Sequence, residues 1–342
     1  MLRRRTPAIL GSDRRPFPGS IAALEPVPIG GTRQWVLLRG VDPQQPVLLV
    51  IPDGPGETLL PLARRVQGEL ERAFVVANWD PRGSGLSQDR DVLDSSLTLE
   101  RLVEDAVELA RWLARRCGTD RVVLAGHGFG SVVGILAAQR APECFTAYIG
   151  VGQWVEPLES ERRSLAWARE EAERRNRRDL LGSLGTLGAP GRSDPGPPPV
   201  LRAAVRSLGG EFVNPDGRSN ARPSIAGAQE YTVLDLWYRR PRGIARSRRT
   251  VGQEVRGIDL ATRVTRLGVP TFFIAGRHDH VVDPELAREY LRVLEAPRKG
   301  WAWIEETAHL APFEDPDAYA AALAHYAHDA RGPAAPSWSV AG

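Results

Sequence analysis

Lysine, cysteine and long apolar runs are scarce in this chain of 342 residues. Lys299 is the one lysine, so nearly all of the basic residues are arginines. Cys117 and Cys144 are the two cysteines, which excludes a dense disulfide framework and a metal site built on C-x-x-C spacing. No run reaches about 18 apolar residues, so we expect no membrane span. The apolar stretch after the first arginines is too short for a signal peptide, and we expect a cytoplasmic protein.

An excess of one charge is also missing. The 45 basic and 42 acidic residues leave a net charge of +3, so nothing in this balance requires nucleic acid or a membrane surface as a partner. We therefore expect a small-molecule substrate or ligand, and the oligomeric state stays open. We expect no cofactor and no metal. The run His278-Asp279-His280 is discounted as a metal site because adjacent residues on one loop rarely converge on one ion.

The order of apolar segments predicts the fold class. With 42% hydrophobic and 25% charged residues, the composition is that of a globular protein. Uniformly apolar segments alternate with helical patterns, which predicts an α/β fold with a mostly parallel sheet covered by helices on both faces. We expect two antiparallel edge strands within 21–41, then strands at 46–51, 74–79, 122–124, 148–151, 270–275 and 301–304. We expect helices at 57–71, 98–116, 129–140, 158–177, 284–295 and 315–329.

The alternation stops after the strand at 148–151 and resumes with the strand at 270–275. The intervening residues read as helices and a stretch rich in glycine and proline, which is typical of an insertion between two halves of one sheet. The chain is therefore expected to divide into a loose N-terminal segment (1–20), an α/β core (21–151 and 261–330), a helical cap insertion (152–260) and a flexible tail (331–342).

The run LAGHGFGS, from Leu124 to Ser131, follows an apolar strand and opens a helix. This context is that of the nucleophile elbow of α/β hydrolases, whose usual pattern is G-x-S-x-G. Gly128 stands at the central position and has no side chain. The motif therefore indicates the fold and argues against a serine acyl-enzyme. Glycine also relaxes the strained backbone of such a turn.

Ligand sites of open parallel sheets lie at the carboxyl ends of the strands. In chain order these ends carry the run P-D-G-P-G with Asp53, the elbow with Gly128, a turn with Asp279 and a final loop with His309. The order nucleophile, acid, histidine is that of α/β hydrolases. We predict that Asp279 orients His309 as an acid–base pair and stabilises its protonated form. Asp53 is a candidate second acid or base, facing Gly128 and His309.

Five runs of the sequence carry a resemblance to a known family: NWDPRGSGLS (78–87), LAGHGFGSVVGILAAQRAPE (124–143), AYIGVGQWVEPLESERRS (147–164), GRHDHVVDPELA (276–287) and ETAHLAPFEDPDAY (306–319). The sequence resembles the α/β-hydrolase superfamily, in its proline iminopeptidase-like branch, over about residues 20–330. Members of that branch cleave N-terminal residues, or other small amides and esters, through a serine acyl-enzyme. The resemblance places Gly128, Asp279 and His309 at the three triad positions.

The sequence departs from this family at two points, and both affect formation of the acyl-enzyme. The family has serine where this chain has Gly128, and it has H-G-G-P-G where residues 52–56 read P-D-G-P-G. The resemblance implies an oxyanion hole made by the backbone N–H groups of Gly54 and Phe129. A carboxylate at Asp53 would oppose an oxyanion there, and one such donor is worth about 3–4 kcal/mol of transition-state stabilisation. Acyl-enzyme chemistry is therefore not expected.

Two features of the cap have competing interpretations. The resemblance places Glu159 and Glu161 where cap carboxylates would meet a substrate amine, whereas the alternative is a solvated helix face. The arginine run between Arg239 and Arg249 is expected to coat the exterior of the cap, with binding of an acidic ligand as the alternative.

Three classes of function stay open. The first is an atypical enzyme in which the pair His309–Asp279 performs acid–base chemistry on a small molecule under the cap, by water-mediated hydrolysis, elimination, cyclisation or isomerisation. The second is a catalytically inactive pseudoenzyme that binds a ligand or serves as a scaffold. The third is residual aminopeptidase-like amide or ester hydrolysis that uses another serine, Ser131 or Ser84, and would be labelled by a fluorophosphonate.

Overall fold

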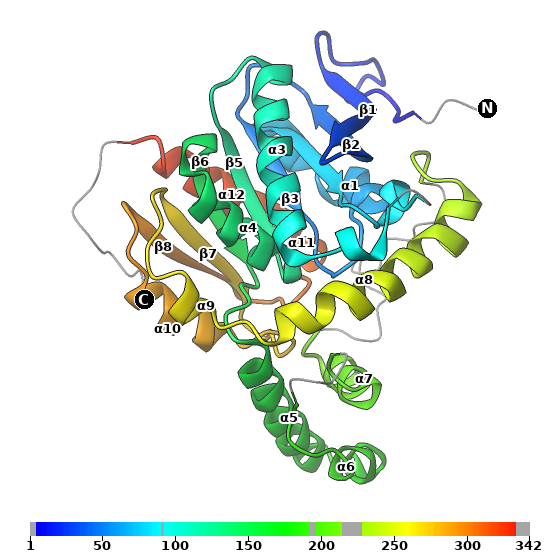
Figure 1. Cartoon of the computed structure of the whole chain (residues 1–342), viewed down its shortest axis with the longest axis vertical. Helices are drawn as coiled ribbons and strands as arrows, with labels where there is room; N and C mark the ends of the chain where they lie inside the picture. The colour runs from blue at the N-terminus through cyan, green and yellow to red at the C-terminus, as the bar shows by residue number, and fades with distance from the viewer. Residues whose placement is uncertain (1–4, 90–91, 192–195, 214–227, 333–342) are drawn as a thin grey trace.

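A computed structural model describes residues 5–89, 92–191, 196–213 and 228–332. The centre of the fold is one eight-stranded sheet with the order β1-β2-β4-β3-β5-β6-β7-β8 (Figure 1). Strands β1 and β2 run antiparallel to their neighbours, and the other strands are parallel. The strands are β1 (Ile21–Ile29), β2 (Thr32–Gly40), β3 (Val47–Ile51), β4 (Val75–Asp80), β5 (Val122–His127), β6 (Phe145–Val151), β7 (Thr271–Gly276) and β8 (Lys299–Ile304).

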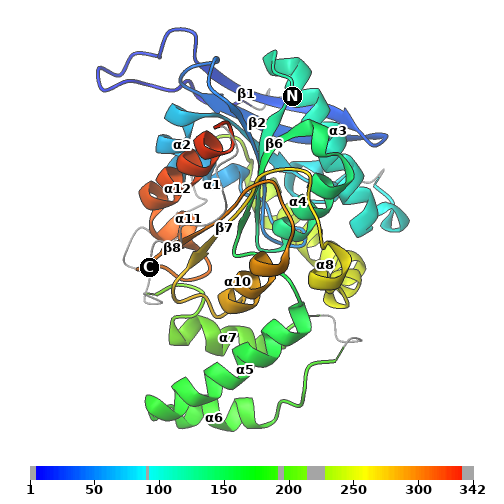
Figure 2. The same cartoon turned by 90° about the vertical axis from the view of Figure 1, so that its left-hand side faces the viewer.

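Helices cover both faces of the sheet, as the uniformly apolar strands require (Figure 2). Every residue of β3, β4 and β5 is buried. One face carries α1 (Leu60–Val66), α2 (Gly68–Ala73), α11 (Ala311–Glu314) and α12 (Pro316–Asp329). The opposite face carries α3 (Leu99–Cys117), α4 (Phe129–Arg140) and α10 (Pro284–Val293). The predicted α/β architecture is confirmed. Within the described ranges, no helix is both long and apolar enough to cross a membrane.

The helices inserted between β6 and β7 are α5 (Pro157–Arg174), α6 (Arg178–Gly185), α7 (Pro199–Leu208), the π-helical turn Asp235–Arg239, α8 (Arg240–Arg256) and α9 (Leu260–Arg263). Helices α5, α6 and α7 lie beyond the sheet at one end of the molecule (Figures 1 and 2), whereas α8 and α9 pack against the core, where Val251, Val255 and Leu260 belong to its main apolar cluster. Helices α5, α6 and α7 share an apolar cluster of their own that includes Leu165, Leu184 and Leu201. We call α5 to α8 the cap. Short 3-10 turns elsewhere span Gly85–Ser87, Asp94–Ser96 and Pro142–Cys144.

The described part of the N-terminal segment, residues 5–20, contacts the core, although we expected it to be loose. The hydroxyl of Thr6 donates to Glu230 at 2.7 Å and accepts from Arg39 at 2.8 Å. Arg39 also forms a buried ion pair of 2.6 Å with Glu71. The predicted tail lies almost entirely outside the described residues, which end at Gly332.

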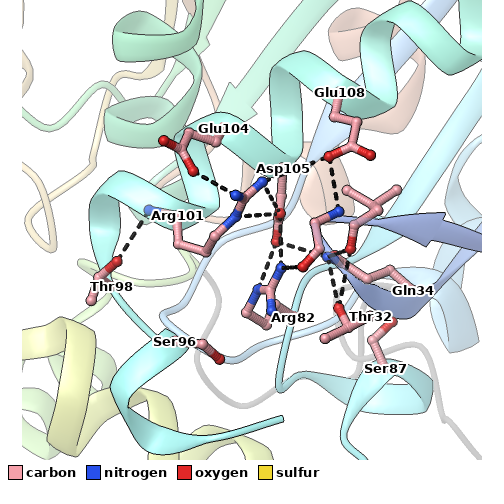
Figure 3. Close-up of polar contacts among 12 residues, drawn as sticks. Thr32, Gln34, Arg82, Ser87, Ser96, Thr98, Arg101, Glu104, Asp105 and Glu108 are labelled. Carbon is pink, nitrogen blue, oxygen red and sulfur yellow. Dashed lines mark hydrogen bonds and ion pairs between the residues drawn. The ribbon is translucent and has the colours of Figure 1, made fainter. Parts of the chain in front are cut away.

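A buried network fixes the turn that follows β4 (Figure 3). Arg82 makes two hydrogen bonds to the carboxylate of Asp105 on α3, of 2.8 and 3.0 Å, and a third of 2.8 Å to the carbonyl of Gly30. Asp105 also accepts from Gln34 on β2 at 2.7 Å and from Arg101 at 2.8 Å. The side chains of Arg82 and Asp105 are 2% and 0% exposed. This network joins the β1–β2 hairpin, the turn after β4 and α3.

Removing Asp105 would therefore leave the guanidinium of Arg82 buried without its counter-charge. We expect Asp105→Ala to lower the free energy of unfolding by about 3–5 kcal/mol, measured by chemical denaturation. The matched control is Arg33→Ala, which removes an exposed ion pair of 3.6 Å to Asp89 and should cost less than about 1 kcal/mol. Equal losses in the two variants would contradict a structural role for the buried network.

Candidate active site

Four sequence-predicted site residues lie in loops at the carboxyl ends of neighbouring strands. Asp53 follows β3, Gly128 follows β5, Asp279 follows β7 and His309 lies in the loop after β8. Because these strands are parallel and lie within five consecutive positions of the sheet, their carboxyl ends open at one edge. The structure brings all four residues together there.

Gly128 forms the sharp turn between β5 and α4. Its backbone angles are φ +53° and ψ −118°, a region that residues with a Cβ rarely adopt. The amide of Gly128 donates to the carbonyl of Val151 at 2.9 Å, which anchors the turn to the end of β6. The first amide of the following helix belongs to Phe129 and points into the site.

The carboxylate of Asp53 lies over Gly128. A Cβ built on Gly128 would stand 2.1 Å from Oδ1 of Asp53, 2.6 Å from Cγ and 3.2 Å from Oδ2. The carboxylate therefore occupies the space into which a side chain at position 128 would project. Oδ1 accepts a hydrogen bond of 2.8 Å from the amide of Phe129. One of the two predicted oxyanion donors, the Phe129 amide, therefore already donates to Asp53. The other, Gly54, lines the adjoining cavity, and its role as a donor stays a prediction.

Asp279 and His309 form a buried hydrogen-bonded pair. Nδ1 of His309 lies 2.8 Å from Oδ2 of Asp279. The other oxygen of Asp279 accepts from the amides of Val281 and Val282, both at 2.9 Å, which fixes the carboxylate in place. Asp279 and His309 are 1% and 4% exposed. This arrangement orients the ring so that Nε2 points away from Asp279 and faces Asp53.

His309 stands between two carboxylates, because its Nε2 lies 3.5 Å from Oδ2 of Asp53. Burial alone would lower the pKa of His309, but the charge and hydrogen bond of Asp279 and the nearby carboxylate of Asp53 raise that pKa well above 6.5. Burial would likewise raise the pKa of Asp53, but the contact with His309, the charges of His309 and His127, and the Phe129 amide lower it to about 2. These shifts favour an ionised Asp53 beside a protonated His309 at neutral pH.

His127 packs against this cluster from the end of β5. Its ring stacks on that of His309 with centroids 4.9 Å apart, and its Nε2 lies 3.0 Å from the carbonyl of His309. Burial, followed by the charge of His309, lowers the pKa of His127. The stacking and the contact with the His309 carbonyl show that His127 supports the position of His309.

A cavity of about 1220 Å³ lies between the strand ends and the cap. The core contributes Asp53, His127 and His309, and the cap contributes residues of α5, α7 and α8. This volume is large enough for a drug-sized small molecule. The side chain of Asp53 is 30% exposed, whereas that of His309 is 3% exposed. Asp53 is therefore the most exposed side chain of the cluster.

The two cap glutamates lie in different surroundings. Glu161 lines the cavity and forms a buried ion pair of 2.6 Å with Arg256. Glu159 is held by Arg162 and Arg163 on its own helix and does not line the cavity. The binding roles suggested for both residues stay predictions.

The arginine run of α8 does not lie wholly on the exterior, contrary to our expectation. Arg246 and Arg249 pair with Asp94 of the core, but Arg240 and Arg248 line the cavity and both contact Glu57. Positions 240 and 248 are eight residues apart, which is close to two helical turns and places them on one face. That spacing was a signal in the sequence, and Glu57, which follows P-D-G-P-G, had none.

The remaining candidates have structural partners. Ser131 is fully buried, and its hydroxyl donates to the carbonyl of Gly128 at 2.6 Å. Ser84 is 2% exposed. The ring of His280 stacks on that of Trp167 with centroids 3.8 Å apart. Across the described ranges, no group of three or more histidine, cysteine and acidic side chains has the arrangement of a metal site.

The close approach of Asp53 to Gly128 predicts an energetic coupling between them. Gly128→Ala adds backbone strain at positive φ and a clash with Oδ1, and we expect it to cost about 2–5 kcal/mol of folding stability. In an Asp53→Ala background the clash disappears, and the same substitution should cost about 1–3 kcal/mol less. Gly182→Ala, on α6 with nothing within 4 Å, is the control and should be nearly neutral. Equal costs in both backgrounds would show that Asp53 does not fill this space.

The charges around His309 predict how stability depends on pH. Because its pKa is raised on folding, His309 stabilises the fold below pH 6.5. This stabilisation is lost as the pH rises through the pKa of the folded state. Because its pKa is lowered on folding, Asp53 stabilises the fold above pH 3.8. This stabilisation is lost as the pH falls toward about 2. The native protein should therefore exceed Asp53→Asn in stability most clearly between pH 3.8 and 6.5. In NMR titration the imidazole pKa of His309 should fall in Asp53→Asn, and an unchanged pKa would contradict the pairing.

Comparisons with known proteins agree with this architecture. A profile described as "Alpha/beta hydrolase family" matches residues 48–322. The "Probable aminopeptidase YbaC" of Bacillus subtilis (strain 168) is 31% identical over 309 residues, which are 90% of this chain and 97% of that protein. Among solved structures, a proline iminopeptidase-related protein from Thermus thermophilus is 24% identical, with a TM-score of 0.61 and coverage of 91% of this chain and 98% of that one. The proline iminopeptidase of Mycobacterium smegmatis is 17% identical, with a TM-score of 0.63 and coverage of 90% and 98%. The chain therefore belongs to the alpha/beta hydrolase family, with proline iminopeptidase-like proteins among its neighbours.

Proposed function

We propose that this protein is an atypical hydrolase of small molecules that works without a serine nucleophile, through acid–base chemistry of His309 held by Asp279. One observation carries the proposal: the carboxylate of Asp53 fills the space above Gly128 and faces Nε2 of His309 at 3.5 Å. A serine side chain is absent from that point, and a charged group contributed by another loop is present there. The role of Gly128 as the vacant nucleophile position rests on this arrangement and on the elbow pattern.

The acid–base role rests on the environment of His309. Asp279 fixes the tautomer by accepting from Nδ1, so Nε2 is the atom that exchanges a proton with the substrate or with water. Nε2 has no hydrogen-bond partner among the described residues. In the resting state the imidazolium is an acid, and it becomes a base once it has given up that proton. The cavity above it supplies the enclosed space in which such transfers are efficient.

Amide hydrolysis of the aminopeptidase type is the second candidate, supported by the relative from Bacillus subtilis. The surroundings of the cavity favour it less. The carboxylates of Glu161 and Glu159, which would receive a substrate amine, are already paired with arginines of the cap. In addition, the Phe129 amide already donates its hydrogen bond to Oδ1 of Asp53, so it is not available to stabilise an oxyanion. A pseudoenzyme that binds its ligand without chemical change is the third candidate.

The test compares the native protein with His309→Gln. Loss of the acid–base group should lower turnover by about 10²–10⁴-fold while the fold is kept. Both proteins are incubated with a metabolite extract, and the products are compared by mass spectrometry. The control is His325→Gln, a histidine on α12 outside the cavity, which should behave as the native protein does.

The same experiment separates the three candidates. A product that depends on His309, with no fluorophosphonate labelling of the native protein, supports the proposal. Labelling that is lost in Ser131→Ala or Ser84→Ala would favour serine chemistry. Ligand binding with no chemical change in either folded protein would favour the pseudoenzyme and contradict the proposal.

A further inference from the structure

The cap side of the cavity carries more arginines than carboxylates. Within the described ranges, the arginines that line the cavity are Arg202 and Arg206 of α7 and Arg240, Arg248 and Arg256 of α8. Apart from Asp53, the acidic residues of the lining are Glu57, Glu161 and Glu211. Glu161 pairs with Arg256, and Glu211 pairs with Arg206. The remaining three arginines therefore have one carboxylate, Glu57, among them.

Glu57 is shared by two of these arginines and satisfies neither fully. Its carboxylate contacts Nη2 of Arg240, but Nε of Arg240 is buried without a hydrogen-bond partner among the described residues. The nearest nitrogen of Arg248 lies 3.7 Å from Glu57, which is longer than a hydrogen bond. Arg248 is therefore held by charge alone, and its donors stay available to a ligand.

Arg202 has no counter-charge of its own. In the part of the chain that the structure describes, its side chain forms no ion pair and no hydrogen bond, although it lines the cavity. Burial lowers the pKa of Arg202, and the charges of Arg248 and Arg206 lower it further. Arg248 therefore acts on Glu57 from one direction and on Arg202 from another.

An anion between Arg202 and Arg248 would relieve this repulsion. Two guanidinium groups without a counter-ion destabilise each other, and the cost is larger in a partly desolvated cavity than in water. Guanidinium groups donate in pairs to a carboxylate, and Arg240 already takes one from Glu57. The acid–base cluster beneath has two carboxylates for one imidazolium, which opposes a dianion more strongly than a monoanion. The charges therefore fit a carboxylate better than a phosphate.

The rest of the lining favours an apolar body on the same ligand. Aromatic and aliphatic side chains from the core and the cap make up much of the wall, among them Trp154, Val155, Phe212, Leu236 and Phe313. Burial of an apolar group against these side chains stabilises binding without a polar partner. A ligand that suits the whole cavity is therefore apolar at one end and anionic at the other.

We propose that Arg202 and Arg248 form an anion subsite of this cavity and that its ligand is a small molecule with one carboxylate and an apolar body. The inference rests on the proposed function only in taking this ligand as the molecule on which His309 acts. It concerns binding, so it is tested without turnover.

The first test measures binding by isothermal titration calorimetry on the full chain. The probes are benzoate, 4-phenylbutyrate and octanoate, each compared with its neutral amide, together with phenyl phosphate. At least one acid should bind about tenfold more tightly than its amide. If no acid binds more tightly than its amide, the anion subsite is refuted. Tighter binding of phenyl phosphate than of every acid would overturn the assignment to a carboxylate.

The second test assigns the preference to the two arginines. Arg202→Gln and Arg248→Gln should each weaken binding of the preferred acid about tenfold and leave binding of its amide unchanged. The matched control is Arg249→Gln, because Arg249 is adjacent on α8, pairs with Asp94 and does not line the cavity. Equal losses in the control would show that net charge, and not this subsite, attracts the acid.

Removing the competing carboxylate should have the opposite effect. In Glu57→Gln, Arg248 loses its only printed ion-pair partner and becomes fully available, so the preferred acid should bind more tightly. Asp94→Asn removes an equal charge outside the cavity and should leave that affinity unchanged. Unchanged affinity in Glu57→Gln would contradict the role of Arg248.

The outcomes separate this inference from the proposed function. A preference for the acid that depends on Arg202 and Arg248, with no product that depends on His309, keeps the subsite and refutes the proposed function. If the molecule consumed through His309 in the metabolite extract is neutral or cationic, the substrate class is refuted and the acid–base function is kept.

Discussion

The contact between the carboxylate of Asp53 and the bare backbone of Gly128 determines the rest of this site. Oδ1 reaches the Phe129 amide because no side chain stands on Gly128, and Oδ2 then comes to lie 3.5 Å from His309. Residues with a Cβ rarely adopt the backbone angles of Gly128, and a Cβ there would meet Oδ1 of Asp53, so the turn and the carboxylate depend on one another. A change at either residue alters the donor, the charge and the shape of the site together.

Electrostatic balance explains why these groups are tolerated in a buried position. A buried ionised group is costly unless it is paired, and here one imidazolium is shared by two carboxylates. The amides of Val281 and Val282 satisfy Asp279, and the amide of Phe129 satisfies Asp53. The same principle holds at the turn after β4, where Arg82 and Asp105 join three segments of the core. At both sites the strands determine where the loops begin, and the ion pairs hold the loops in position.

Much of the fold could be predicted from the sequence because burial leaves a clear pattern. Helix α4 has the predicted bounds, since Gly128 ends the strand before it and the following residues are uniformly small or apolar. The predicted helix at 57–71 divides into α1 and α2 at Gln67, which bonds to Asn78 beneath it. Strand β6 begins at Phe145, three residues before the prediction, where it meets the irregular register of β5. Tertiary contacts, and not local preference, decide both differences.

The site was predictable in part for a similar reason. Strand ends identify Asp53, Asp279 and His309 as neighbours, because parallel strands open at one edge. The sequence does not determine that Asp53 lies directly over Gly128, since this depends on the path of the loop after β3. The spacing of Arg240 and Arg248 puts them on one helical face, but the sequence does not show that this face turns toward the cavity, because the run of arginines lacks the apolar contrast that marks an inner helical face.

The central claim is that an ionised Asp53 takes the place of a side chain at the elbow. A crystal structure at atomic resolution tests it most directly, through the position of the carboxylate and its two C–O bond lengths. The account predicts Oδ1 within hydrogen-bond distance of the Phe129 amide, Oδ2 facing His309, and two equal bond lengths. An Asp53 side chain turned away from Gly128, or two unequal bonds that mark a protonated acid, would contradict it.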